Sequence, residues 1–144
     1  MTMLEGRVKM VMALGMRAAV KEKVARLSEL ADLIPQAART LDGTKNLRRA
    51  QEAVLDAMGL EILAKAVGKN ETERKANAAI LSAEDQGYQE QADIVRECQA
   101  GEMDDGMALG QLEREWRALS IAVNVFVATL NFLAGSDINI EGEV

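Results

Sequence analysis

The amino-acid sequence predicts an all-α protein of four helices, in which a long, coiled-coil-like C-terminal helix assembles copies of the chain into an oligomer. Three observations predict this class. The 144 residues include one Pro, which leaves helix as the default over most of the chain. Apolar residues recur at intervals of three and four positions, as they do on one face of a helix. Hydrophobic residues make up 49% of the chain and charged residues 28%, which is typical of a soluble helical protein and excludes a disordered one.

The first helix is expected over residues 4–34. Pro35 should end or kink it, because Pro has no N–H and disfavours helical geometry at the preceding residue. A turn is expected at residues 41–44, where Gly43 can adopt a left-handed conformation and Thr44 can cap the next helix. The apolar and small residues of the first helix form two sets, each with steps of four, three, four and three: Leu4, Val8, Val11, Gly15 and Ala18, then Val20, Val24, Leu27, Ala31 and Ile34.

A second helix is expected from about residue 45 to residue 67, with Gly68 ending it. Asn70 then caps a third helix, and Glu73 stands three residues later, where a capping box has its acidic member. This third helix should reach about Ala83, and residues 84–87 form a short break. The expected buried side of the second helix consists of Leu47, Val54, Leu55, Met58, Ile62 and Ala66.

The last segment, residues 88–134, has the clearest pattern in the chain. Eight apolar residues keep an unbroken heptad register, which is specific for a helix that packs along its length against another helix. Neighbours such as Ile121 and Val125 widen the apolar surface, so several helices are expected around it. Gly135 is the expected C-cap. We predict that a homo-oligomer forms through these eight residues: Leu109, Leu112, Trp116, Leu119, Val123, Phe126, Leu130 and Leu133.

Two stretches of this last segment, one rich in glycine and one strongly apolar, each allow two interpretations. Around the glycines at 101, 106 and 110 the helix either turns back or continues through a weak middle, and we favour continuation. Residues 118–134 are strongly apolar, but polar residues interrupt them and the stretch is shorter than the roughly 20 residues that a membrane span needs. We therefore expect this stretch to be buried in protein and expect no membrane partner.

The net charge of −6 is unevenly distributed. Residues 1–50 hold ten Lys or Arg and five Asp or Glu (net +5), whereas residues 51–144 hold seven and eighteen (net −11). One interpretation is that the two parts attract each other, within a chain or between subunits. The other is that the basic part contacts DNA, although it contains no aromatic residue on which bases could stack. The candidate nucleic-acid contacts are Arg17, Lys21, Lys23, Arg26, Arg39, Lys45, Arg48 and Arg49.

The predicted organisation is a single structural domain with three segments: a basic helical pair at 1–67, a helix and the long assembly helix at 68–135, and an acidic tail at 136–144. The lone Cys98 cannot form a disulfide within one chain, which suits a reducing cytosol. The N-terminus lacks the basic region and unbroken apolar run of a signal peptide. We expect a cytoplasmic protein.

The sequence argues against catalysis. It contains no His, so Cys98 has no imidazole to activate it and general acid–base chemistry lacks its commonest group. The acidic residues between 102 and 105 do not match a calcium loop, and no Gly-rich phosphate loop is present. We predict that the protein is not an enzyme and needs no cofactor or metal.

Three motifs carry a resemblance to a known group of proteins. They are Asn-Glu-Thr-Glu-Arg-Lys-Ala at residues 70–76, Tyr-Gln at 88–89 and Arg-Glu-Trp at 114–116. This pattern resembles that of small, mostly uncharacterised helical bacteriophage proteins, and more distantly the chain is similar to phage recombination mediators. The resemblance covers residues 68–134 and implies an uninterrupted helix between Tyr88 and Trp116. It also implies an accessory role in phage recombination, and a phage-encoded chain would act in the host cytoplasm.

Three hypotheses for the function follow. In the first, the protein is a non-enzymatic, oligomeric phage-type accessory protein that binds DNA in recombination or replication. In the second, it is an acidic inhibitor or anti-defence protein whose −11 region occupies a nucleic-acid site on a host protein. In the third, it is a structural virion or scaffold component. The implied partners are therefore copies of the chain itself, together with either DNA or a host protein.

Overall fold

The computed structural model describes residues 2–135, and over this range the chain forms three α-helices. They are α1 (Met3–Lys65), α2 (Glu71–Glu84) and α3 (Gln86–Ala134). The all-α prediction is confirmed, whereas the prediction of four helices is wrong because the first two predicted helices are one. The predicted acidic tail at 136–144 lies outside the described residues.

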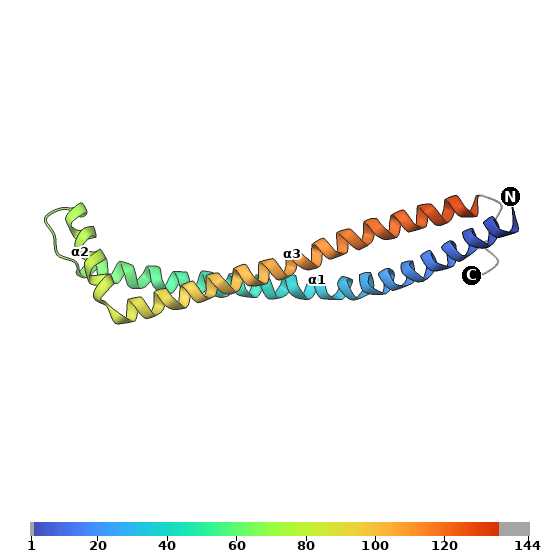
Figure 1. Cartoon of the computed structure of the whole chain (residues 1–144). Helices are drawn as coiled ribbons and strands as arrows, with labels where there is room; N and C mark the ends of the chain where they lie inside the picture. The colour runs from blue at the N-terminus through green and yellow to red at the C-terminus, as the bar shows by residue number, and fades with distance from the viewer. Residues whose placement is uncertain (1, 136–144) are drawn as a thin grey trace. The chain divides into compact units, whose positions relative to one another are not determined.

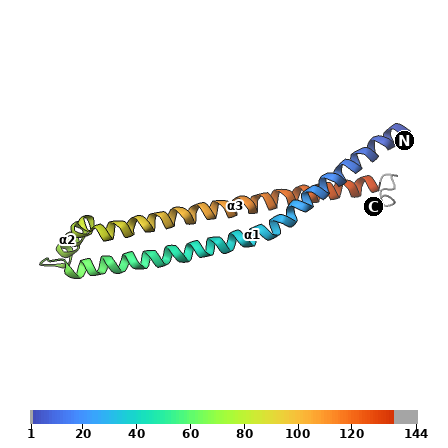
Figure 2. The ribbon, with the colours of Figure 1, turned by 90° about the horizontal axis from the view of Figure 1, so that it is seen from below.

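The chain divides into two compact units. Among the described residues, unit 1 comprises 2–36 and 110–135, and unit 2 comprises 37–109. In each unit a stretch of α1 lies antiparallel to a stretch of α3, and unit 2 also contains α2 (Figures 1 and 2). These units differ from the predicted segments 1–67 and 68–135, because each unit pairs stretches from opposite ends of the sequence.

The helix α1 continues through both signals that should have ended it. Pro35 lies inside the helix, and Gly43 has open space around it. The hydroxyl of Thr44 does not cap a new helix: it lies 2.9 Å from the carbonyl oxygen of Thr40, one turn earlier, and also contacts the carboxylate of Asp105 on α3. The contacts that α1 makes with α3 before Pro35 and after Gly43 therefore outweigh the local cost of these two residues, which is about 3 kcal/mol for an internal Pro and about 1 kcal/mol for Gly.

The covered face of α1 differs from the predicted stripe. In unit 1, Leu4, Val8 and Val11 of the first predicted set and Val24 of the second are exposed. In unit 2 the predicted buried side is wrong at Leu47 and Val54, which are exposed as well. The residues that are buried or half-buried along this face step by three and four throughout: Ala13, Met16, Val20, Lys23, Leu27, Leu30 and Ile34 in unit 1, then Ala37, Leu41, Thr44, Arg48, Gln51, Leu55, Met58 and Ile62 in unit 2.

The helix α3 is continuous through the glycines at 101, 106 and 110, as favoured from the sequence. It begins at Gln86, and only Asp85 separates it from α2. Asp85 serves both helices: its backbone N–H donates to the carbonyl oxygen of Leu81 (2.9 Å), and its carboxylate accepts a hydrogen bond from the backbone N–H of Tyr88 (2.7 Å). The break predicted at residues 84–87 is therefore a single residue.

The start of α2 confirms Asn70 as its N-cap. The side chain of Asn70 accepts a hydrogen bond from the backbone N–H of Glu73 (2.8 Å), and the Glu73 carboxylate accepts one from the backbone N–H of Lys69 (3.2 Å). Just before it, a Cβ atom on Gly68 would lie 2.7 Å from the backbone N of Arg74, so only Gly fits this close approach.

We expect Asn70→Ala to lower the free energy of unfolding by about 1 kcal/mol, because the N–H of Glu73 loses its acceptor. Asn46→Ala is the matched control, since Asn46 is exposed in the interior of α1, where Ala favours helix. Chemical denaturation followed by circular dichroism measures both variants. Equal destabilisation by the two changes would contradict the capping role of Asn70.

The helix α1 begins with a capping box that the sequence analysis missed. The hydroxyl of Thr2 accepts a hydrogen bond from the backbone N–H of Glu5 (3.2 Å), and the Glu5 carboxylate accepts one from the N–H of Thr2 (3.1 Å). The Thr-x-x-Glu spacing was the available signal.

Little apolar surface is buried by this arrangement. Six of the described residues are buried: Ala13, Leu30, Ala66, Ala78, Val95 and Leu133. In unit 1, Ala13 and Leu133 pack with Met16 and Leu130, while Leu30 is buried separately. A chain that is 49% hydrophobic therefore leaves most of its large apolar side chains at least partly accessible.

Candidate functional site

The eight residues predicted as an oligomer interface lie on the face of α3 that carries its contacts with α1. In unit 1, Leu130 and Leu133 pack with Ala13 and Met16, and Lys23 lies over the ring of Phe126 at 5.8 Å. The remaining exposure of these residues differs: Leu133 is buried, Trp116 is exposed, and the other six (Leu109, Leu112, Leu119, Val123, Phe126 and Leu130) are half-buried. A contact of these residues with a second copy stays a prediction, because the cover observed on them comes from the same chain.

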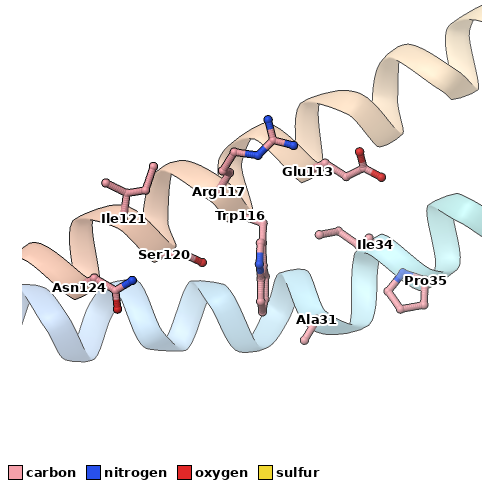
Figure 3. Close-up of a pocket in the computed structure, with 9 residues that line it drawn as sticks. All are labelled: Ala31, Ile34, Pro35, Glu113, Trp116, Arg117, Ser120, Ile121 and Asn124. Atoms are coloured by element: carbon pink, nitrogen blue, oxygen red, sulfur yellow. The ribbon is translucent and has the colours of Figure 1, made fainter.

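Unit 1 has an open groove of about 590 Å³ between its two helices. Figure 3 shows the Trp116 side chain extending from α3 toward α1, where it ends near Ala31. Pro35 also lines the groove, and it cannot donate a hydrogen bond to the Ala31 carbonyl. The floor is mostly apolar and suits an apolar side chain better than a polar substrate. The complete lining is Ala31, Ile34, Pro35, Glu113, Trp116, Arg117, Ser120, Ile121 and Asn124.

An ion pair next to this groove joins the two helices of unit 1. The guanidinium of Arg26 donates two hydrogen bonds to the Glu115 carboxylate, at 2.7 and 3.0 Å, and a third to Glu29 at 2.8 Å. These bonds to Arg26 lower the pKa of Glu115 from its ordinary value near 4.5, and they raise that of Arg26. Both side chains are more than a third exposed, so water and salt weaken the pair.

We expect unit 1 to lose stability in acid through Glu115. The pKa of Glu115 is lowered in the folded chain, so the pair contributes fully above about pH 4.5, the unfolded value, and its contribution falls as the pH drops through the folded value. Glu115→Gln should therefore flatten the dependence of the melting temperature on pH below 4.5. Arg26→Gln should flatten it equally, and the double variant should add nothing. Additive effects of the two changes would contradict the pairing.

In unit 2 polar contacts join α1 and α3. Arg48 on α1 forms an ion pair with Glu102 on α3 and a second one with Glu52 at 2.8 Å. A hydrogen bond from Gln99 (3.2 Å), followed by that from Arg48, lowers the pKa of Glu52. One turn further along α1, Gln51 accepts two hydrogen bonds from the Gln91 amide of α3, one at its side-chain oxygen (2.8 Å) and one at its backbone carbonyl (3.0 Å). Each contact needs one particular register, so together they specify how the helices align.

The eight predicted nucleic-acid contacts lie in different environments. Lys21, Arg39 and Arg49 are exposed, while Lys45 is half-buried beside Glu102 in a shallow groove of unit 2. The other four are engaged within the chain: Arg26 and Arg48 in ion pairs, Lys23 over Phe126, and Arg17 in a further interaction. The pairs Arg26–Glu115 and Arg48–Glu102 join the basic and acidic parts of the chain, as the charge-pairing interpretation predicts.

The first apolar set predicted for α1 forms an exposed stripe on unit 1. We call it the α1 outer stripe: Leu4, Val8, Val11, Gly15 and Ala18. All five residues are exposed, and the side chain of Val11 reaches 69%. The spacing was recognised correctly, but periodicity alone could not tell that a second face of the same helix, with Ala13 and Met16, packs against α3.

The helix α3 has a matching exposed stripe. The α3 outer stripe consists of Ala118, Ile121, Val125, Ala128 and Phe132, with steps of three, four, three and four. All five are exposed, and Val125 reaches 58%. Ile121 and Val125 were predicted to widen the apolar surface, but the stripe itself was not predicted. The same spacing rule, applied to a second face of the helix, would have found it.

Residues 118–134, which were expected to be buried in protein, are mostly accessible within one chain, and their burial by a second copy stays a prediction. Within them only Leu133 is buried. Among the described residues, α3 is the single helix that is long and apolar enough to cross a membrane, with an 18-residue window of mean hydropathy 1.6 that is only 6% buried. This criterion concerns length and composition alone, and the absence of a membrane partner stays a prediction.

Among the described residues, no His, Cys, Asp and Glu side chains form a group of three or more that could hold a metal ion. Cys98 is half-buried in unit 2, in a position that suits a small packing residue. The two outer stripes and the groove at Trp116 are therefore the features of unit 1 that offer a binding surface.

Comparison with known proteins yields no relative: no family model, no curated protein and no solved structure matches this chain.

Proposed function

We propose that this protein is a non-enzymatic helical accessory protein that acts by associating with copies of itself through the exposed apolar faces of unit 1. The observation that carries the proposal is the balance between buried and exposed apolar residues. Among the described residues, 23 large hydrophobic side chains are exposed and six residues are buried. Soluble monomers rarely leave contiguous apolar patches of this kind open, and such patches mark interaction surfaces.

The distribution of the exposed side chains supports unit 1 as the associating part. Of the 23, fourteen belong to unit 1: Met3, Leu4, Val8, Met10, Val11, Met12, Leu14, Val24, Leu33, Trp116, Ile121, Val125, Val127 and Phe132. In unit 2, by contrast, ion pairs and amide hydrogen bonds join α1 and α3 and already use much of their facing surface.

Of the three settings considered from the sequence, a structural or scaffold role fits this proposal best. Self-association through apolar faces is what such a role requires, whereas DNA binding would need basic side chains gathered on one face. Two of the eight candidates, Arg26 and Arg48, are neutralised by carboxylates of the same chain. The bacteriophage setting itself depends on the sequence resemblance at residues 68–134.

Light scattering on the purified protein, at concentrations from about 1 to 100 μM, tests the proposal. We expect a mass that is a multiple of 15.6 kDa, with a melting temperature that rises with concentration. Val125→Asp should reduce the mass toward that of one chain while circular dichroism still reports helix, because Val125 makes little contact within the chain. A well-folded 15.6 kDa species at every concentration would refute the proposal.

Leu60→Asp is the matched control for that variant. Leu60 is 67% exposed and lies in unit 2, so the change places the same charge on an equally open position outside the proposed contact. We expect this variant to keep the mass of the unmodified protein. If Leu60→Asp dissociated the assembly as completely as Val125→Asp, association would not depend on unit 1.

A further inference from the structure

We propose that the α3 outer stripe of one copy docks on the α1 outer stripe of a second copy, with the two helices antiparallel. This inference rests on the proposed self-association and names the surfaces and the register that it uses. Both stripes belong to unit 1, cover 15 residues each and are exposed along their whole length. At 1.5 Å per residue each stripe is about 21 Å long, which is four helical turns.

All five layers of the two stripes match only when the helices run in opposite directions. Along α1 the steps are four, three, four and three, and along α3 they are three, four, three and four. Reading α3 backwards makes the two series identical, so every layer of one stripe meets a layer of the other. Antiparallel heptad helices pair in this manner, with side chains of one helix filling the spaces of its partner.

Side-chain sizes are compatible with this register. It places Val11 opposite Val125 at the centre and Leu4 opposite Phe132 at one end. Gly15 comes opposite Ile121, and no atom lies within 4 Å of the position that a Gly15 Cβ would take, so the larger side chain has room there. At the other end two alanines, Ala18 and Ala118, meet and allow the backbones to approach closely.

The charges at the end of the stripes favour a second copy as the occupant. The next layer after the two alanines places Glu22 opposite Arg114, two exposed side chains of opposite sign. A chain that carries both the acid and the base at matched positions is complementary to itself in this register.

A lipid bilayer is a poorer occupant for the same surface. The contacts Ala13–Leu133 and Lys23–Phe126 place residues 13–23 of α1 alongside the charge-free stretch of α3. That part of α1 contains Arg17, Lys21, Glu22 and Lys23. Inserting α3 with its partner helix would therefore carry several charges into the hydrocarbon, where charged side chains are costly.

Each copy has one stripe on α1 and one on α3. A contact between two copies therefore uses the α3 outer stripe of the first copy and the α1 outer stripe of the second. The α1 outer stripe of the first copy and the α3 outer stripe of the second can then bind further copies. Head-to-tail contacts of this type form a ring when the rotation closes and an open filament when it does not.

Cysteine pairing between two singly substituted proteins tests the register. In a Cys98→Ser background, Val11→Cys is mixed with Val125→Cys and the mixture is oxidised. We expect a disulfide-linked dimer in the mixture, and almost none when either variant is oxidised alone. The control mixes Met10→Cys, on a different face of α1, with Val125→Cys and should give several-fold less dimer.

The outcomes separate this inference from the proposed function. If the unmodified protein associates but the mixture does not cross-link, the register is wrong and the proposed self-association remains. Efficient cross-linking of Val11→Cys alone would replace the contact with a symmetric one between α1 helices. If the protein is a monomer, both proposals fail.

Charge reversal gives a second test that needs no cysteine. Glu22→Arg or Arg114→Glu alone should raise the dissociation constant about fivefold, the size typical of an exposed ion pair. The double variant, which restores opposite charges in the same layer, should recover the original value. Two single effects that add in the double variant would overturn the predicted pairing of Glu22 with Arg114.

Discussion

Leu30→Ala is expected to lower the free energy of unfolding by about 2–5 kcal/mol, the range for removing a fully buried Leu side chain. Leu30 is 0% exposed and is the largest fully buried side chain among the described residues. Because so few residues of this chain are buried, the cavity left by Ala would remove much of the apolar burial in unit 1. The loss would be a large fraction of the 5–15 kcal/mol that stabilise a typical domain.

Leu33→Ala is the matched control for Leu30. The two leucines lie one turn apart in α1 and undergo the same chemical change, but Leu33 is 37% exposed. We expect a loss below about 1.5 kcal/mol for Leu33, since part of its side chain is already in water. Urea denaturation at several protein concentrations measures both variants and separates folding from association. Similar losses for the two variants would contradict the packing of α1 described above.

Pro35→Ala is expected to raise the free energy of unfolding by about 2 kcal/mol. Inside a helix, Pro is about 3 kcal/mol less favourable than Ala, because it lacks the N–H that would donate to the carbonyl of Ala31. Part of this gain is offset because Ala gives the unfolded chain more freedom than Pro does. Pro35 is exposed, so the change removes little packing.

Gly43→Ala independently tests whether α1 is a continuous helix at this position. A Cβ atom on Gly43 would meet no other atom within 4 Å, so the expected gain is about 1 kcal/mol from helix propensity alone. Thermal or urea unfolding followed by circular dichroism reports both variants. If Pro35→Ala destabilised the protein, the helix would end near Ile34, as the sequence analysis first predicted.

Several elements of the fold followed directly from local chemistry. The cap at Asn70 was predicted correctly because its side-chain oxygen accepts a hydrogen bond from an N–H only three residues further along the chain. The unbroken run from Leu109 to Leu133 was recognised as one packed helix because its heptad spacing has no interruption. Both signals involve residues close together in the sequence.

The candidate site was predicted only in part. The spacing identified Leu4, Val8 and Val11 as members of one apolar stripe, and the structure leaves them exposed. The groove beside Trp116 could not be predicted, because it forms between stretches of α1 and α3 that are about 80 residues apart in the sequence. The sequence shows where the basic residues are, but which of them form ion pairs with carboxylates depends on the alignment of α1 with α3.

By itself, the sequence determined that this chain is helical and that its apolar residues repeat every three and four positions, because propensity and periodicity act within a few residues. Tertiary structure alone decided that α1 runs through Pro35 and Gly43 and that the face with Ala13 and Leu30, rather than the outer stripe, packs within the chain. The physical reason is that both faces of α1 have helix-compatible spacing and differ only in their partner. That partner, α3, comes from the other end of the chain, where no local preference can specify it.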